Sequence, residues 1–481
     1  VTYNLPMFQL TKIKNRLGIA VLFIGDIICL LILFQVSVFL RKNLLPVFFN
    51  DLPLLLSDLS IYGWIFPIWL AIMTYEGAYS RRFSAWDEVK FLWKSSFFAC
   101  VAVFTILFIS KKGPEFSRIL MVIMGTLSVI LFPFLRAGLK KLIYSADLMK
   151  RKMLIVGSGE AAVAAFNAVK NESNLGYDIA GFVDDSSAQT ELCGLKVHAQ
   201  LDQIERYINS AGIHDVIVAK PELEKDALIK LINAIQHKAE NTLYIPDFKG
   251  LAVSGTELRY FFREQAMIIE IKNNLSNPLN YAAKRSIDYL AGLLVFILTL
   301  PLLALIAYLI RRDSPGPAIL VQRRIGKNGR SFRCYKFRTM YLDAEERLNA
   351  ILKTDPKAKE EWEKFWKLKD DPRITKAGQW LRSTSLDELP QVINVLKGEM
   401  SLIGPRPYLP REKEFLADEG ATILKLPPGI TGLWQISGRS DTSCDFRITM
   451  DSWYVKNWDL WLDIMIIFKT VGVVFNREGA R

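Results

Sequence analysis

The chain has 481 residues, which is too long for one ordinary domain, so two to four domains are expected. Hydrophobic residues make up 51% of it and are unevenly spread, which indicates membrane segments beside soluble parts. The net charge of +12 favours anionic partners such as a lipid surface, phosphates or nucleic acid. The five cysteines form no Cys-x-x-Cys pair and there are three histidines, so neither a zinc centre nor a disulfide framework is indicated.

Four apolar stretches predict a bundle of transmembrane helices. Residues 17–40 are long enough to span a bilayer and are interrupted only by Asp26 and Gln35. We interpret Asp26 as a polar contact between helices, with a functional role as the alternative. Basic residues gather before the first stretch, between the second and third, and after the fourth, so both ends of the bundle are expected in the cytoplasm. This region covers residues 1–145. The other stretches are residues 59–75, 95–110 and 119–135.

A short apolar strand pattern at residues 153–156 leads directly into a glycine turn and then into a helical pattern over residues 161–169. Gly157 and Gly159 in this turn would let backbone N–H groups approach a pyrophosphate at the helix N-terminus. A second strand pattern ends at Asp184, where a ribose-binding acid would lie. These three residues are candidate nucleotide-binding residues.

The order of strand, glycine turn and helix predicts a Rossmann-like α/β domain over residues 146–275. An alternative is that this domain serves regulation or dimerisation and carries no chemistry. No Tyr-x-x-x-Lys pair occurs in the chain, so the usual base of short-chain dehydrogenases and epimerases is missing. Nucleotide binding and a purely regulatory domain therefore both stay open.

A fifth apolar segment, residues 287–310, does not suit a simple membrane crossing. Basic pairs flank it on both sides, and Pro301 lies in its middle. Proline removes one helix N–H and clashes with the preceding turn, so it kinks a helix. We therefore expect a re-entrant helix that enters and leaves the membrane on the cytoplasmic side. The alternative is an ordinary span, which would place residues 311–481 outside the cell.

Two adjacent carboxylates, Asp387 and Glu388, lie in a segment that is rich in arginine and lysine. Arg382 precedes them, and Arg406 follows them in a Gly-Pro-Arg-Pro run. Neighbouring side chains on a helix point about 100° apart, so the two acids are expected to have different roles. The simpler alternative is that they occupy the first turn of a helix, where acidic groups favour the helix dipole.

Further cations and a glycine-rich segment accompany the acidic pair. Lys336 and Arg338 alternate with aromatic residues, which predicts a strand with both cations on one face. Residues 428–439 are rich in glycine, which allows the backbone to come close to a ligand, and they include Gln435 and Arg439.

This combination of residue types suits phosphoryl transfer. Arginine, lysine and Mg²⁺ neutralise charge on the non-bridging oxygens of a phosphate. A carboxylate can attack phosphorus and form an acyl phosphate, while its neighbour holds a metal or tunes its charge. The residues predict a phosphate site in which Asp387 and Glu388 are catalytic and are also candidate ligands of Mg²⁺.

Residues 280–481 resemble the bacterial sugar transferases, also called monotopic phosphoglycosyl transferases, because several long motifs occur in order. Four helices and a Rossmann-like domain ahead of this part resemble the long form of the family, the undecaprenyl-phosphate hexose phosphotransferases. The runs Glu361-Trp-Glu-Lys364 and Asp451-Ser-Trp-Tyr-Val-Lys-Asn457 are most similar to its galactose-1-phosphate members, with glucose-1-phosphate members as the alternative. The shared motifs are Lys336-Phe-Arg-Thr-Met340 and residues 381–391, 394–407 and 428–439.

The resemblance implies that Asp387 is the nucleophile that attacks the sugar-linked phosphate of a UDP-sugar. UMP leaves, and undecaprenyl phosphate then takes the phosphosugar from the enzyme, which starts O-antigen, capsule or exopolysaccharide synthesis. Glu388 matches the partner acid near Mg²⁺, and Pro301 matches the kink of the re-entrant helix. The mostly α-helical catalytic domain would lie at the cytoplasmic face of the bacterial inner membrane. Positions matched to binding of the diphosphate or closure of the pocket are Lys336, Arg338, Arg382, Arg406, Gln435 and Arg439.

The implied partners are a UDP-sugar, undecaprenyl phosphate and membrane lipids; a homodimer is expected from the domain layout, and no nucleic-acid partner is expected. One position departs from the family pattern. Relatives usually carry arginine or lysine directly before the Pro-Gly pair at residues 428–429, whereas this chain has Pro427 and its nearest cation is Lys425. Two other functions are kept as alternatives: a membrane-bound, NAD-dependent enzyme that modifies sugar nucleotides, and a nucleotide-sensing scaffold.

Overall fold

The computed structural model of the chain describes residues 7–49, 59–110, 116–185, 189–247, 256–261, 266–271, 273–365, 368, 371–437 and 443–476. The chain forms two units, Val1–Phe248 and Lys249–Arg481. Hydrophobic cores lie within each unit. The three domains expected from the sequence, with boundaries near residues 145 and 280, stay a prediction.

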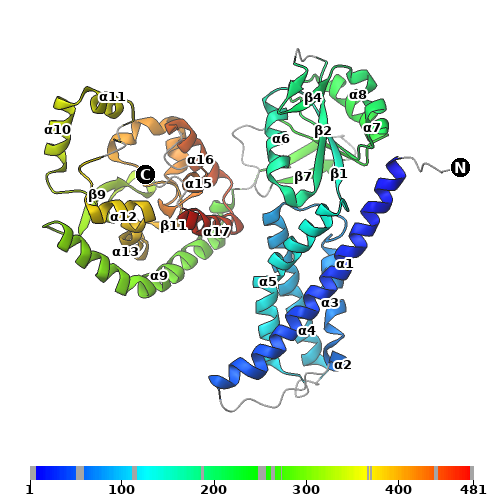
Figure 1. The fold of residues 1–481 in the computed structure, drawn as a ribbon, viewed down its shortest axis with the longest axis horizontal. Coiled ribbons are helices and arrows are strands. Elements are labelled where there is room, and N and C mark those ends of the chain that lie inside the picture. The colour runs from blue at the N-terminus through cyan, green and yellow to red at the C-terminus, as the bar shows by residue number, and fades with distance from the viewer. Residues whose placement is uncertain are drawn as a thin grey trace. The chain divides into compact units, whose positions relative to one another are not determined.

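The first unit begins with the predicted bundle. Its long helices are α1 (Met7–Phe39), α3 (Ile65–Tyr75), α4 (Ala85–Ile109) and α5 (Arg118–Ser145), and a short α2 (Leu59–Tyr62) precedes α3. Figure 1 shows α1, α4 and α5 running together in blue and cyan, in agreement with the contacts of α5 with the other two. Each of the four helices contributes to a shared core, for example through Leu33, Trp69, Leu92 and Met124.

Four of the described helical segments are long and apolar enough to cross a membrane: Ile13–Val47, Ala85–Ile109, Arg118–Ser145 and Pro278–Asp313. The chain is therefore a membrane protein by the length and composition of its helices. The predicted second span over residues 59–75 is divided by a turn at Gly63, and its longer part, α3, has 11 residues. This is about half the length that a spanning helix needs.

Asp26 makes polar contacts within the bundle. Its carboxylate accepts a hydrogen bond from the Tyr79 hydroxyl at 2.8 Å and lies 3.6 Å from Nη2 of Arg136. Arg136 and Lys140 in turn form ion pairs with Glu88 of α4. All these carboxylates and cations are buried, so each charge is stabilised by a partner rather than by water. This is the contact between helices that the sequence suggests for Asp26.

A six-stranded sheet follows the bundle, with the strand order β3-β4-β2-β1-β5-β6. β1 (Arg151–Val156) lies between β2 (Tyr177–Val183) and β5 (Asp215–Val218) and is parallel to both. Without the short antiparallel β3, the parallel strands have the order 3-2-1-4-5, which is the Rossmann arrangement. The predicted α/β part with a parallel sheet is confirmed. The remaining strands are β3 (Glu191–Leu192), β4 (Leu195–His198) and β6 (Asn241–Tyr244).

Three helices cover the sheet: α6 (Glu160–Asn171), α7 (Ile204–Ala211) and α8 (Lys225–Gln236). Because successive strand residues point to opposite faces, β1 contributes to two cores. Met153 and Ile155 pack in the core with α6, whereas Leu154 and Val156 pack in the core with α7 and α8. Figure 1 shows α6 on one side of the sheet and α7 and α8 on the other.

The second unit contains the long helix α9 (Pro278–Asp313), the antiparallel hairpin of β9 (Ile319–Ile325) and β10 (Ser331–Phe337), and mostly helical segments after them. These segments are α10 (Ala344–Thr354), α11 (Pro356–Phe365), α12 (Lys376–Thr384), the 3-10 helix η8 (Leu386–Gln391), α13 (Val392–Leu396), α14 (Gly420–Ile423), α15 (Leu433–Ile436), α16 (Cys444–Lys456) and α17 (Leu460–Asn476). A parallel pair joins β11 (Ser401–Ile403) to β12 (Gly429–Thr431), and an antiparallel pair joins β7 (Glu257–Phe261) to β8 (Ala266–Glu270).

Helix α9 is bent, and both of its halves pack against its own unit. Pro301 lies inside the helix, and Figure 1 shows α9 curved into an arc. In the first half, a side chain at Gly292 would lie 3.2 Å from Val395 of α13. In the second half, Ile306 and Ile310 share a core with β10 and α12. A straight helix of 36 residues would be about 54 Å long, so the bend brings its two ends back to one body.

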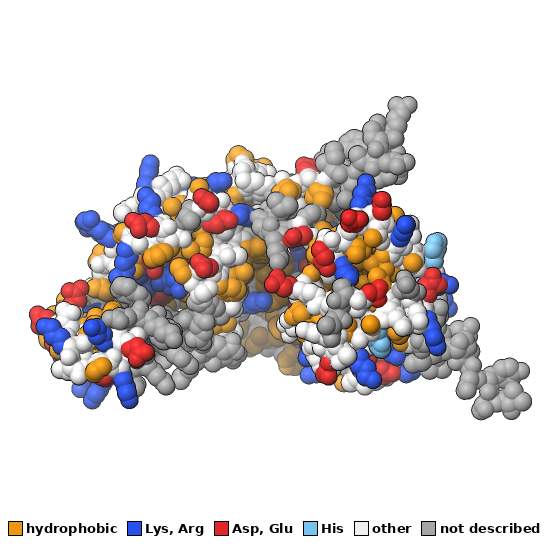
Figure 2. Space-filling model, turned by 90° about the horizontal axis from the view of Figure 1, so that it is seen from above, with side chains coloured by type: hydrophobic (Ala, Val, Ile, Leu, Met, Phe, Trp, Pro, Cys, Tyr) orange, Lys and Arg blue, Asp and Glu red, His pale blue; other side chains and the backbone are white. Residues whose placement is uncertain are grey.

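Charged side chains of both signs occur on the face drawn in Figure 2. Lysine and arginine side chains, in blue, are interspersed with aspartate and glutamate side chains, in red, and with hydrophobic side chains in orange. The positive net charge of the sequence is thus accompanied by acidic groups on the described part of this face.

Candidate functional site

The acidic pair lies at a change of backbone geometry between two helices. Helix α12 ends at Thr384, and the next residue, Ser385, has φ 58 in the left-handed region. Asp387 and Glu388 follow in the 3-10 helix η8. A 3-10 helix has three residues per turn, so neighbouring side chains point about 120° apart. The expectation that the two acids point in different directions therefore holds, although the local helix is not an α-helix.

Strand β10 brings Lys336 to the acidic pair. Its Nζ donates a hydrogen bond to Glu388 Oε1 across 2.6 Å. Burial raises the pKa of Asp387 to about 6, and the charge of Glu388 adds to this, whereas Lys336 and Arg382 oppose it. At pH 7 about nine-tenths of a carboxyl group with this pKa is ionised. Asp387 is therefore a partly desolvated carboxylate, which is a suitable nucleophile.

Arg382 reaches the pair from the last turn of α12. Burial lowers the pKa of its guanidinium, and the charge of Asp387 acts in the opposite direction. Its Nε donates to Oγ1 of Thr339 at 3.0 Å. Helix α12 lies directly on the backbone at Thr339, since a Cβ added at Gly378 would be 2.1 Å from the Thr339 carbonyl oxygen.

Arg338 has a different set of partners from Lys336. Its guanidinium donates to the carbonyl oxygens of Ser314 at 2.7 Å and Pro315 at 2.6 Å, and to the Ser314 hydroxyl at 2.9 Å. Burial lowers the pKa of this guanidinium. The structure therefore places Arg338 at the turn that follows α9, where it holds the backbone, and its role toward a phosphate stays a prediction.

Arg406 lies in a loop that contacts the glycine-rich segment. The backbone N–H of Gly404 donates to Thr431 at 2.9 Å, and that of Gly429 donates to Pro405 at 2.8 Å. A Cβ at Gly429 would lie 2.1 Å from the nitrogen of Gly404, so only glycine permits this approach. The two loops therefore form one surface.

Aromatic and acidic groups position Arg406 on this surface. Its guanidinium lies 5.2 Å from the ring centre of the buried Trp434, and Arg447 lies 4.4 Å from the same ring. The backbone N–H of Arg406 donates to Asp451, which also accepts from the Tyr408 hydroxyl. Burial raises the pKa of Asp451 to about 6.

The β9–β10 hairpin links this surface to the acidic pair. Arg324 of β9 donates from Nη1 to the Pro407 carbonyl oxygen at 2.9 Å, while Lys336 of β10 pairs with Glu388. Burial lowers the pKa of Arg324 and the charge of Arg406 lowers it further, whereas Cys334, Glu412 and Glu388 act in the opposite direction. The charges of Arg406 and Glu388 therefore both act on the buried guanidinium of Arg324.

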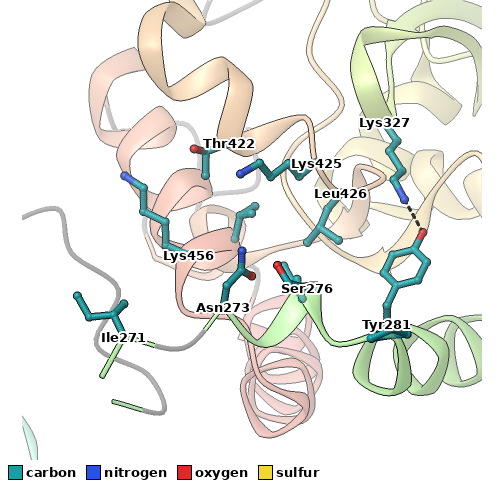
Figure 3. Close-up of a pocket in the computed structure, with 12 residues that line it drawn as sticks. Ile271, Asn273, Ser276, Tyr281, Lys327, Thr422, Lys425, Leu426 and Lys456 are labelled. Atoms are coloured by element: carbon teal, nitrogen blue, oxygen red, sulfur yellow. Dashed lines mark hydrogen bonds between the residues drawn. The ribbon is translucent and has the colours of Figure 1, made fainter. Parts of the chain in front are cut away.

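The other predicted positions differ in how directly they reach this site. Gln435 donates from Nε2 to the Ile430 carbonyl oxygen at 2.9 Å and so shapes the glycine-rich loop. Arg439 lies outside the described residues. Pro301 lies in the bent helix α9. Pro427 is buried, and Lys425 lines a separate pocket beside Lys327 (Figure 3).

The candidate nucleotide site lies at the carboxyl ends of the parallel strands. Gly157 has φ +116, and a Cβ there would be 2.6 Å from the Ala219 carbonyl oxygen, whereas Gly159 has open space around it. Asp184 is buried and pairs with Lys220 at 2.7 Å, and it accepts a hydrogen bond from Ser158 at 2.5 Å. The acid predicted to bind a ribose is therefore engaged by side chains of its own domain, and nucleotide binding stays a prediction.

Mg²⁺ binding at the acidic pair stays a prediction, which the chemistry of its two side chains allows. Among the residues that the structure describes, no cluster of three or more His, Cys, Asp or Glu side chains could hold a metal by itself. Mg²⁺ in enzymes of phosphate chemistry is commonly bound by one or two carboxylates, with substrate phosphates and water as the other ligands. Asp387 and Glu388 can supply those carboxylate oxygens.

Several residues of the site escaped the sequence analysis. Thr339 binds Arg382, Trp434 lies against two guanidinium groups, and Lys220 pairs with Asp184. Thr339 and Trp434 lie within the motifs themselves, so those motifs carried a signal for them. Lys220 lies two residues after the end of strand β5, and its position at the carboxyl edge of the sheet was the available signal.

Comparison with known proteins agrees with the motifs. Residues 279–477 match the family described as bacterial sugar transferase, and residues 75–246 match one described as a CoA-binding domain. An undecaprenyl-phosphate galactose phosphotransferase of Salmonella typhimurium is 39% identical over 87% of this chain and 86% of that protein. A UDP-galactose-lipid carrier transferase of Erwinia amylovora is 38% identical over 89% of this chain and 87% of that protein. A UDP-glucose:undecaprenyl-phosphate glucose-1-phosphate transferase of Klebsiella pneumoniae is 32% identical over 69% of each chain. The extent of these matches, together with the ordered motifs around Asp387, establishes that the chain belongs to the bacterial sugar transferase family.

Proposed function

We propose that the protein transfers a hexose 1-phosphate, with galactose favoured, from a UDP-sugar to undecaprenyl phosphate and releases UMP. The observation that carries this proposal is the partly buried carboxylate of Asp387 beside Glu388, with Lys336 and Arg382 as cations that act on it. A carboxylate among cations can attack an anionic phosphate because the cations offset the repulsion between the two. The reaction would be the first membrane step of O-antigen, capsule or exopolysaccharide synthesis.

The reaction divides into two displacements at phosphorus. A carboxylate oxygen of Asp387 attacks the phosphate that bears the sugar, and the bond to UMP breaks with its electron pair leaving on UMP. A phosphate oxygen of undecaprenyl phosphate then attacks the same phosphorus. The bond to Asp387 breaks, the carboxylate is restored, and undecaprenyl-diphospho-hexose is formed.

Other residues of the site have supporting roles in this proposal. Arg382 neutralises non-bridging oxygens beside Asp387, and Arg406 offers a second guanidinium on the loop surface. Lys336 pairs with Glu388 in the absence of substrate, and its ammonium also interacts with the diphosphate once the UDP-sugar is bound. Asp387 and Glu388 would hold Mg²⁺, which when bound supplies positive charge to the diphosphate.

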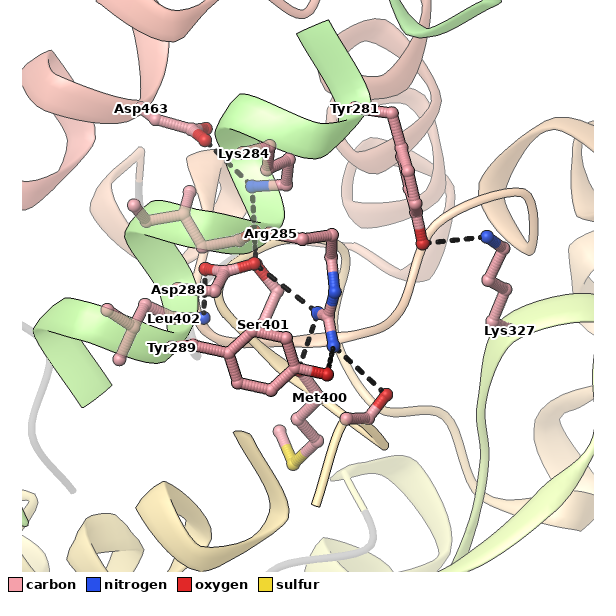
Figure 4. A network of polar contacts seen from close by, with 12 residues as sticks. Tyr281, Lys284, Arg285, Asp288, Tyr289, Lys327, Met400, Ser401, Leu402 and Asp463 are labelled. Carbon is pink, nitrogen blue, oxygen red and sulfur yellow. Dashed lines mark hydrogen bonds and ion pairs between the residues drawn. The ribbon is translucent and has the colours of Figure 1, made fainter. Parts of the chain in front are cut away.

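Helix α9 supports a re-entrant membrane insertion rather than a crossing. At its start, the buried Lys284 forms an ion pair with Asp463 of α17 at 2.7 Å and donates to the Ile403 carbonyl oxygen at 3.0 Å (Figure 4). One turn further, Asp288 accepts hydrogen bonds from Ser401 at 2.8 Å and from the Leu402 N–H at 3.0 Å. The first half of α9 is thereby fixed to the strand that leads to Arg406.

The far end of α9 is fixed to the same unit. Asp313 accepts a hydrogen bond from the N–H of Ala377 in α12 at 3.0 Å, and Arg338 binds the Ser314 backbone. Between these ends the helix exposes large apolar side chains such as Leu290 and Leu298. A bent apolar helix whose ends are held by one body can dip into a bilayer from one side. We therefore place the catalytic part at the cytoplasmic face of the bacterial inner membrane.

The decisive experiment measures UMP release from UDP-galactose with purified full-length protein, without the lipid acceptor and with it. Without the acceptor, the unmodified protein should release about one UMP per active site and carry one covalently bound phosphosugar. Asp387→Asn should release no UMP and carry no phosphosugar. Asp418→Asn is the matched control because Asp418 is an exposed acid, and it should behave as the unmodified protein. Retained UMP release by Asp387→Asn would exclude this mechanism. Transfer from UDP-glucose without any transfer from UDP-galactose would exclude galactose as the substrate.

Two exposed cysteines allow a direct test of the topology. Cys193 lies in the α/β part and Cys444 in the catalytic part, and both are free and exposed. An impermeant maleimide should label both in inverted membrane vesicles and neither in spheroplasts, and single Cys193→Ser and Cys444→Ser variants separate the two signals. Labelling of Cys444 only from outside the cell would show that α9 crosses the membrane. The homodimer stays a prediction.

A further inference from the structure

A cavity of about 440 Å³ lies beside the start of α9 (Figure 3). It contains none of the residues assigned to the phosphosugar site. Its walls come from the segment before α9 and the start of α9 itself, from the turn after β9, from α14 and the loop after it, and from α16. The lining residues are Ile271, Asn273, Leu275, Ser276, Pro278, Tyr281, Lys327, Thr422, Lys425, Leu426, Val455 and Lys456.

Three lysines surround this cavity. Figure 3 shows the Lys425 side chain reaching toward the cavity, and within the part of the chain that the structure describes its ammonium has no hydrogen bond or ion pair. Lys327 donates to the hydroxyl of Tyr281 at 2.8 Å, so its own partner is neutral. Lys456 pairs with Glu419 at 3.0 Å, and the residues that line the cavity include no aspartate or glutamate. The cavity thus carries a net positive charge.

The cavity also has neutral polar groups and an apolar wall. Ser276, Thr422 and Asn273 offer hydroxyl and amide groups, which can bind phosphate oxygens. Leu426 and Val455 stand among the residues of the apolar wall. A ligand that fits both parts has an anionic group and an attached hydrophobic portion.

The position of the cavity relative to α9 indicates where such a ligand comes from. Pro278 is both the first residue of α9 and a lining residue, and the next residue, Leu279, is 78% exposed. The apolar segment of α9 begins at residue 287, nine residues after Pro278, so with α9 inserted as proposed above the cavity lies on the headgroup side of that segment. This is the level of phospholipid headgroups.

We propose that this pocket binds the phosphate headgroup of an anionic membrane phospholipid. The lysines around the cavity attract the phosphate. Lys425 contacts this phosphate directly, because within the described part of the chain no acidic side chain pairs with the Lys425 ammonium. The glycerol and upper acyl chains cover the apolar wall, which a free phosphate ion would leave in contact with water. A lipid held here anchors the start of α9 at the headgroup level. The proposal does not depend on the transfer reaction, because it concerns residues outside the phosphosugar site.

The test uses full-length protein in detergent and three probes: dioctanoyl-phosphatidylglycerol, dioctanoyl-phosphatidylcholine and inorganic phosphate. Native mass spectrometry measures the affinity of each. Phosphatidylglycerol should bind more tightly than phosphatidylcholine, and inorganic phosphate should not compete. Lys425→Ala should weaken phosphatidylglycerol binding about fivefold, because one lysine near an anionic lipid contributes about that factor.

Two variants control for charge and for surface position. Lys425→Arg keeps the cation and should keep the affinity. Lys413→Ala removes an exposed lysine that does not line the cavity, and it should bind as the unmodified protein does. Equal phosphatidylglycerol affinity in Lys425→Ala and Lys413→Ala would overturn the proposal, as would competition by inorganic phosphate. A raised KM for undecaprenyl phosphate in Lys425→Ala with unchanged phosphatidylglycerol binding would assign the pocket to the acceptor instead.

Discussion

The ammonium of Lys336 donates to Glu388 across 2.6 Å, so the nearest lysine of the site is engaged by the second acid of the pair. Asp387 therefore meets the lysine only as a neighbouring charge, and its burial keeps its pKa at about 6. Glu388 is therefore paired with a cation, whereas Asp387 remains available as the proposed nucleophile.

The first prediction concerns the pH dependence of the reaction. Since the pKa of Asp387 is raised to about 6, the carboxylate becomes protonated as the pH falls through this value, and kcat/KM should fall about tenfold for each pH unit below it. Lys336→Met removes a charge that lowers this pKa, so the midpoint of the profile should move upward. Lys397→Met removes an exposed lysine that pairs with Tyr335 and should leave the midpoint unchanged. A downward shift in Lys336→Met would contradict the assignment.

A second prediction separates anchoring from substrate binding at Arg338. Its three hydrogen bonds to the turn after α9 would be lost in Arg338→Met, and the carbonyl and hydroxyl groups of the buried Ser314 would lose this partner. We expect a loss of about 1.5–3 kcal/mol in stability, seen as a lower unfolding temperature in detergent. The exposed Arg330→Met is the matched control. An unchanged unfolding temperature together with a raised KM for the UDP-sugar would instead favour a phosphate-binding role.

A third prediction concerns the buried pair that fixes the first half of α9. Lys284→Met leaves the carboxylate of Asp463 buried without the ammonium group that pairs with it. This should lower the free energy of unfolding by about 3–5 kcal/mol. The double variant Lys284→Met/Asp463→Leu replaces both charges by apolar groups and should recover part of that loss. Unfolding temperatures of the single and double variants test this coupling. Equal destabilisation in both would mean that the ion pair itself contributes little.

A fourth prediction compares two glycines of one turn. Gly157→Ala forces a side chain into a backbone conformation with φ +116 and against the Ala219 carbonyl oxygen, so it should destabilise the α/β part by more than about 1 kcal/mol. Gly159→Ala meets open space and should be nearly neutral. Limited proteolysis of the full chain, read at sites within the α/β part, measures both. Similar protection in the two variants would remove the structural reason for glycine at position 157.

Local patterns predicted the elements that carry the site. The strand with Lys336, the parallel sheet after the bundle and the curvature of α9, which contains Pro301, all follow from periodicity, glycine or proline. The alternation of Lys336 and Arg338 predicted a shared face, yet strand β10 ends at Phe337. Beyond that point the pleat no longer sets the direction of a side chain, and Arg338 turns to the backbone after α9.

Partners that lie far apart in the chain could not be read from it. Lys284 and Asp463 are 179 positions apart, and Asp184 and Lys220 are 36 apart. Each of these residues has a plausible local role, such as a flanking charge of a membrane helix or a ribose ligand. The packing of helices and strands in the folded chain brings each lysine to its aspartate, so the two charges of each pair neutralise each other.

Gly378 has a consequence for the position of Arg382. Helix α12 rests on the Thr339 backbone because position 378 presents only a hydrogen atom at the contact. A methyl group there would act as a wedge and tilt α12 outward, and the guanidinium of Arg382 would retreat from both Thr339 and Asp387. A residue without any reactive group thus determines how closely the helix that carries Arg382 approaches the backbone after the strand that carries Lys336.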